Sequence, residues 1–138
     1  MTTMARTACH GFTLVECLTV CAMVAVLATV AWPAWHGHSL RAARLDAVAA
    51  LTQLQTVQES YRSLHGLYAA DLSVLHGVAP VSNQGRYTLA LERTGPESYR
   101  ATALAQGPQT VDRECSALTL DVNLGFATPG PGPQCWNR

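Results

Sequence analysis

An apolar run near the N-terminus, from Phe12 to Trp35, contains a single charged side chain, Glu16. An α-helix rises about 1.5 Å per residue, so a helix of this length spans the roughly 30 Å hydrocarbon core of a bilayer. Arg6 is the one firm positive charge ahead of the run, and it gives a weak bias towards a cytoplasmic N-terminus. The sequence therefore predicts one membrane-spanning helix, with the remainder of the chain exported.

Glu16 is the unusual residue of this run. A charged carboxylate at membrane depth costs on the order of a few kcal/mol, so it normally lies where that cost is reduced. Two interpretations remain open from charge placement alone. Glu16 lies near the end of the span and reaches the lipid head groups, or it meets a cation of another molecule.

The segment Gly11-Phe12-Thr13-Leu14-Val15-Glu16, followed by the apolar run, resembles the processing site of type IV prepilins and related pseudopilins. The resemblance implies that a prepilin peptidase cleaves between Gly11 and Phe12 and methylates the new amino terminus of Phe12. It also implies that Glu16 meets the amino terminus of a neighbouring subunit. Pro33 stands where many family members have a proline that bends the N-terminal helix.

A conventional cleaved signal peptide is the competing interpretation of the N-terminus. Its apolar region is normally about 7 to 15 residues long, with small residues three and one before the cut. The run here is longer, and Thr29 stands two residues before Ala31. His10 departs from the prepilin pattern, in which a basic residue is common at this place. We therefore favour the prepilin interpretation.

Beyond the run, apolar residues recur at steps of three or four up to Leu64, which predicts that the helix continues to His65 and ends at Gly66. The predicted element is one long helix from 12 to 65, bent near Pro33. Its apolar stripe is expected to pack on a sheet, while polar side chains take other faces: Arg41, Arg44, Gln55, Glu59 and Arg62.

Alternating apolar and polar residues predict three strands, at 86–92, 99–103 and 118–122, with a turn at 94–97 and a short turn at 71–75. An antiparallel meander against the helix is the simplest packing, so the predicted fold class is α+β. The expected organisation is a leader at 1–11, a transmembrane and polymerisation helix at 12–35, and a soluble domain at 36–138. That domain contains the rest of the helix at 36–65 and the sheet with a C-terminal loop at 86–138.

The five cysteines fall into three groups. Cys9 is in the leader, and Cys17 and Cys21 are in the membrane helix, where packing is favoured over a redox or intersubunit bridge. Cys115 and Cys135 are exported, so we predict that they form a disulfide worth roughly 3 kcal/mol; metal binding and free thiols are the alternatives. A C-terminal loop closed in this way resembles that of type IVa pilins and pilin-like minor subunits. The Gly- and Pro-rich segment before Cys135 is expected to be a loop.

No motif for catalysis or for a cofactor is present, so the sequence predicts neither an enzyme nor a cofactor. The histidines do not form a metal set. The acidic residues Asp112, Glu114 and Asp121 are expected on a solvated face, with a calcium site as the less favoured alternative. Nine basic and nine acidic residues give no net field that would point to nucleic acid.

The resemblance implies a structural subunit of a type IV pilus, minor rather than major. It implies that the subunit is inserted in the inner membrane with its N-terminus in the cytoplasm and is then assembled into an extracellular fibre. Its implied partners are other pilin subunits, prepilin peptidase, the inner-membrane assembly machinery and, before assembly, membrane lipid. The alternatives are a type II secretion pseudopilin and a DNA- or surface-binding pilin for uptake or adhesion. DNA binding is the less favoured function, because four arginines without lysine also fit an ordinary mixed surface: Arg86, Arg93, Arg100 and Arg113.

Overall fold

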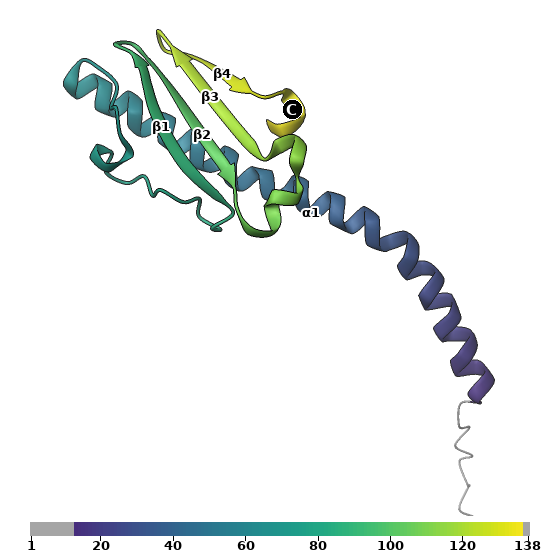
Figure 1. Cartoon of the computed structure of the whole chain (residues 1–138). Helices are drawn as coiled ribbons and strands as arrows, with labels where there is room; N and C mark the ends of the chain where they lie inside the picture. The colour runs from purple at the N-terminus through teal and green to yellow at the C-terminus, as the bar shows by residue number, and fades with distance from the viewer. Residues whose placement is uncertain (1–12, 137–138) are drawn as a thin grey trace, which may run out of the picture. The chain divides into compact units, whose positions relative to one another are not determined.

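The computed structural model describes residues 13–136, apart from the side chains of residues 30–36. The chain divides after His36 into two compact units, each of which is described by itself. Helix α1 (Leu14–His65) belongs to both, and the second unit adds a four-stranded sheet and four short 3₁₀ helices (Figure 1).

Helix α1 begins directly after Thr13, whose side-chain oxygen accepts a hydrogen bond from the Glu16 backbone N–H at 3.3 Å. Such a bond satisfies one of the free donors at a helix start. The predicted helix is confirmed from Leu14 to His65, while Phe12 lies outside the described residues. Among residues 13–136, no helix combines the length and the hydropathy that a membrane span needs. The bend expected at Pro33 involves a side chain outside the described set and remains a prediction.

Gly66 ends the helix as predicted: its φ is +76°, and its N–H donates to the carbonyl of Arg62 at 2.8 Å. Four stripe residues are buried, namely Ala43, Ala47, Leu51 and Leu54. The expectation was wrong for Leu64, which is 79% exposed.

Gln58 is fully buried near the same end of the helix. Its amide oxygen accepts from the Ala69 N–H at 2.9 Å, and its amide nitrogen donates to the Ala69 carbonyl at 3.1 Å. The chain after Gly66 thus folds back over Gln58. Farther along, the helix η1 (Leu72–Val74) occupies the predicted short turn, and a hydrogen bond from the Ser73 backbone lowers the pKa of Asp71.

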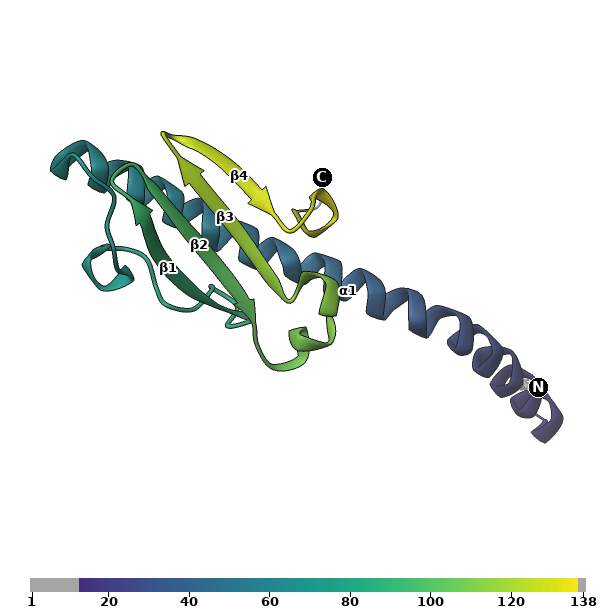
Figure 2. The same ribbon diagram turned by 45° about the horizontal axis from the view of Figure 1, so that its top comes forward.

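The sheet is antiparallel, and its strands follow chain order: β1 (Tyr87–Gly95), β2 (Ser98–Ala105), β3 (Ala117–Asn123) and β4 (Phe126–Gly130). One face of the sheet packs against the second half of α1 (Figure 2). The three predicted strands are confirmed, together with their inward faces. Their main buried residues are Tyr87, Leu89, Tyr99, Ala101, Ala103, Leu118, Leu120 and Val122.

Strand β4 was not predicted, because its segment is rich in glycine and proline. It pairs with β3 through a two-residue turn in which Leu124 and Gly125 both have positive φ, 51° and 84°. This is the turn geometry that suits the twist of a hairpin. β4 is an edge strand, where Pro129 is tolerated despite its missing N–H.

Three 3₁₀ helices complete the fold: η2 (Gly107–Val111) and η3 (Arg113–Cys115) between β2 and β3, and η4 (Pro133–Trp136) after β4. The predicted disulfide is present and joins η3 to η4, with a Cα–Cα distance of 5.4 Å between Cys115 and Cys135. Both cysteines are fully buried. The indole N–H of Trp136 donates to the Gly130 carbonyl at 2.8 Å, which holds the C-terminal segment against β4.

Candidate functional site

Most of the residues predicted to act in processing and assembly fall outside what the structure describes. Gly11 and Phe12 are outside the described residues, as is the side chain of Pro33. Glu16 is exposed in the first turn of α1. Cys17 and Cys21 are free, exposed thiols on the same helix.

All described side chains of residues 13–29 are exposed, although most of them are apolar. Leu14 is 75% exposed and Leu27 69% exposed. A contiguous apolar surface of this extent is typical of a segment that lies in lipid or against other proteins. The helix therefore offers an assembly or membrane surface rather than part of the domain core.

A second candidate site is a hollow of about 360 Å³ beside η2 in the globular unit. Its lining consists of the turn Gln84, Gly85 and Arg86 and the facing segment 106–109; we call it the glutamine hollow. The two sides are joined by a hydrogen bond from the Gln106 backbone N–H to the Arg86 carbonyl at 2.7 Å. Gln84 and Gln106 are exposed, and the Gln106 amide nitrogen already donates to the Thr88 hydroxyl.

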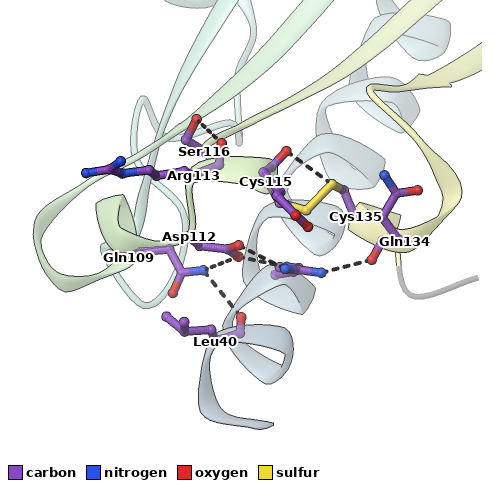
Figure 3. Close-up of polar contacts among 10 residues, drawn as sticks. Leu40, Gln109, Asp112, Arg113, Cys115, Ser116, Gln134 and Cys135 are labelled. Carbon is purple, nitrogen blue, oxygen red and sulfur yellow. Dashed lines mark hydrogen bonds and ion pairs between the residues drawn. A yellow bond between two sulfur atoms is a disulfide. The ribbon is translucent and has the colours of Figure 1, made fainter. Parts of the chain in front are cut away.

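Two exposed arginines flank this end of the domain. Arg86 lines the glutamine hollow, and Arg113 begins η3, just after η2. Figure 3 shows the Arg113 side chain directed away from Asp112 and the disulfide. Neither guanidinium makes a hydrogen bond or an ion pair with any residue that the structure describes. Both remain able to bind an anion.

Other arginines are already engaged. Arg100 forms an ion pair with Asp121 at 2.5 Å on the exposed side of the sheet, and Arg62 pairs with Glu59 and Glu97. Arg93 donates to the backbone carbonyl of Tyr68 at 3.2 Å. The four arginines considered from the sequence therefore do not act as one set of free cations, and only Arg86 and Arg113 among them are unpaired within the described chain.

Arg44 and Asp112 correct two expectations. Arg44 was placed on a helix face other than the apolar stripe, and Asp112 on a solvated face, but both are buried. The Arg44 Nε and Nη2 atoms donate to the two Asp112 carboxylate oxygens at 2.7 and 2.8 Å. This hydrogen bonding is the main cause of the raised pKa of Arg44. The helical spacing of Leu40, Arg44, Ala47 and Leu51 could have placed Arg44 on the buried stripe, but nothing local identifies its partner.

The acidic set considered for calcium also includes Glu114 and Asp121. Asp121 is paired with Arg100, and Glu114 is exposed. Within residues 13–136, no three His, Cys, Asp or Glu side chains are placed to hold a metal ion.

Two family models match this chain. Residues 33–119, more than half of the sequence, match the model described as "Type IV minor pilin ComP, DNA uptake sequence receptor", and residues 6–32 match the "Prokaryotic N-terminal methylation motif". The chain belongs to the ComP family of type IV minor pilins. A search of individual curated proteins finds no match.

The family assignment confirms the predicted type IV minor pilin with a prepilin leader and a methylation motif. The motif marks a pilin precursor of the membrane that is assembled into a pilus, and the matched families are structural rather than enzymatic. Arg86, Arg113 and the glutamine hollow all lie within the segment that matches the minor pilin family. β4 and Cys135 lie beyond it.

Proposed function

We propose that this minor pilin is a filament subunit whose exported domain binds duplex DNA at the glutamine hollow. The observation that carries the proposal is a pair of exposed arginines without a side-chain partner among the described residues, Arg86 in the hollow and Arg113 at the start of η3. The family description, which names a DNA uptake sequence receptor, supports it. Composition alone disfavoured DNA binding, because the total charge of the chain is balanced. The proposal reverses that preference, because Arg86 and Arg113 leave positive charge near the hollow.

The chemistry of the hollow suits a duplex. Guanidinium groups bind phosphate oxygens, often through two parallel hydrogen bonds. Glutamine amides can both donate to and accept from the major-groove edge of adenine. Arg86 and Arg113 would therefore contact the phosphate backbone, while Gln84, which lines the hollow beside Arg86, would contact base edges.

The proposal is tested by measuring DNA affinity against salt concentration. We expect the full-length protein in detergent micelles to bind a fluorescently labelled duplex, with affinity that falls as salt rises. The double variant Arg86→Gln/Arg113→Gln should bind more weakly at low salt. It should also reduce the slope of log K against log salt by about 2, since each phosphate contact contributes about 0.9.

The matched control is Arg100→Gln, which removes an exposed arginine that is already paired with Asp121. It should leave the slope unchanged. Glu114→Gln removes an exposed negative charge next to Arg113 and should strengthen binding. Absence of binding at low salt, or an equal loss in Arg100→Gln and the double variant, would reject the hollow as the DNA site.

We further propose the route by which the subunit reaches the fibre. Prepilin peptidase cleaves between Gly11 and Phe12 and methylates Phe12, and the segment 12–35 crosses the inner membrane once, with the leader in the cytoplasm, before the assembly machinery moves it into the pilus. The match to the methylation motif and the uncovered apolar surface of α1 support this route.

Glu16 is proposed to meet the amino terminus of a neighbouring subunit. Such a pair would neutralise a costly charge and fix the axial register between subunits, with Pro33 setting the direction of the helix. Glu16→Ala and Glu16→Val should both reduce incorporation into filaments. Normal incorporation of both variants would contradict this role.

A further inference from the structure

Arg44 connects the two chain segments that carry the disulfide. We infer that it is a clamp that brings Cys115 and Cys135 together before they are oxidised. The inference does not depend on DNA binding.

The geometry of Arg44 is that of a three-way junction. From α1, its Nε and Nη2 atoms donate to Asp112, and its Nη1 atom donates to the Gln134 carbonyl at 3.0 Å. Asp112 lies three residues before Cys115, and Gln134 immediately precedes Cys135. One buried guanidinium thus fixes both cysteine segments to the same turn of the helix.

The Asp112 side of the junction has its own support. The Gln109 amide donates to the Asp112 carboxylate at 3.2 Å and to the Leu40 carbonyl on α1 at 3.3 Å, so the loop is joined to the helix at two points (Figure 3). The Cys115 N–H donates to the Asp112 carbonyl at 3.1 Å, which carries this placement on to the cysteine.

Hydrogen bonds also hold the Cys135 side of the junction. The Cys135 N–H donates to the Gly132 carbonyl at 3.1 Å, and the indole N–H of the next residue, Trp136, donates to the Gly130 carbonyl. None of these bonds involves a sulfur atom of the disulfide. The two thiols would therefore be adjacent in the reduced, folded domain.

In the step proposed, one thiol loses its proton and attacks a disulfide oxidant such as oxidised glutathione, releasing one glutathione thiolate and forming a mixed disulfide. The second thiolate then displaces the other glutathione. Two electrons pass to the oxidant, and two thiol protons are released. The clamp speeds the attack of the second cysteine on the mixed disulfide, because it already holds that thiol close to the first cysteine.

The test measures which cysteines pair. The fully reduced, full-length protein in detergent micelles is placed in a glutathione redox buffer, quenched by alkylation, and mapped by peptide mass spectrometry. Arg44→Met should lower the effective concentration of Cys135 towards Cys115 by about tenfold and increase the fraction of chains trapped as mixed disulfides with glutathione. Arg44→Lys should fall between, because lysine keeps the charge but cannot form the two-pronged contact.

Arg100→Met is the control, since it removes an exposed ion pair from the sheet and leaves the clamp in place. It should pair its cysteines like the wild type. Unchanged pairing in Arg44→Met would overturn the inference. The inference would also be overturned if Arg44→Met were unfolded even with the disulfide already formed. Arg44 would then be needed for the whole fold and not for bringing the cysteines together.

A second measurement removes the disulfide itself. In Cys115→Ser/Cys135→Ser, hydrogen exchange at residues 133–136 should stay slow, because Arg44 still holds Gln134. Adding Arg44→Met should make exchange there fast while the central strands β2 and β3 stay protected. Fast exchange at 133–136 in the double serine variant alone would show that the disulfide, and not Arg44, holds this segment.

Discussion

At the scale of single residues, Tyr99 has an unusual environment. It is 1% exposed, its ring meets Tyr68 edge-on with 4.7 Å between ring centroids, and its hydroxyl has no hydrogen-bond partner among the described residues. Burial is the main reason that the pKa of Tyr99 is raised well above its ordinary value near 10. A buried hydroxyl without a partner also costs about 1 to 3 kcal/mol.

Tyr99→Phe should therefore stabilise the domain, or leave its stability unchanged, by removing the hydroxyl and keeping the ring. We expect the free energy of unfolding to rise by up to about 1 kcal/mol in urea denaturation at neutral pH. Tyr68→Phe is the comparison, because the Tyr68 hydroxyl donates to Glu59 at 2.7 Å and accepts from Arg62 at 3.1 Å. That variant should lose stability. A large loss in Tyr99→Phe would show that its hydroxyl is bonded after all.

The raised pKa of Tyr99 also predicts how stability depends on pH. The folded state favours the neutral phenol more than the unfolded state does. The contribution of Tyr99 to the free energy of unfolding is therefore complete below about pH 10 and is lost as the pH rises beyond it. Tyr68 and Tyr87 act in the same direction, since burial raises the pKa of each. Denaturation curves should show stability falling above pH 10, less steeply in Tyr99→Phe. An identical fall in both proteins would contradict this assignment.

At the scale of elements, the β3–β4 hairpin contains a costly turn residue. Leu124 has φ 51° and is 61% exposed, whereas asparagine or glycine is preferred at this place in the turn. Leu124→Asn should raise the free energy of unfolding by about 1 kcal/mol. Leu124→Ala removes the exposed side chain but keeps a Cβ in the same backbone conformation, so it should bring little gain. Equal stabilisation by both variants would show that exposure, not the backbone, is the cost.

The elements also differ in how far the sequence could predict them. Helix α1 and strands β1 to β3 follow from local periodicity, because each buries one face. Strand β4 was missed, since its Gly-Pro composition disfavours a strand and its formation depends on pairing with β3. Arg44 and Asp112 are 68 residues apart, so their pairing depends on the tertiary fold. The glutamine hollow was missed for the same reason, as it joins segments from either side of β1 and β2.

At the scale of the whole molecule, the two units differ in where their apolar surface lies. The globular unit buries its apolar side chains between the sheet and α1, whereas the described part of the N-terminal unit exposes them. An apolar surface of this extent is normally covered by lipid or by other proteins, so the N-terminal helix needs such a covering. In the proposed assembly, the globular unit presents Arg86 and Arg113 from the filament.

Mass spectrometry of sheared, purified filaments tests this account most directly. We predict a mature chain that begins at methylated Phe12, contains the Cys115–Cys135 disulfide, and is present in fewer copies than the main fibre subunit. Those features together would establish processing, export and incorporation as a minor subunit. A mature chain that begins after Ala31, or the absence of the protein from filaments, would contradict the account.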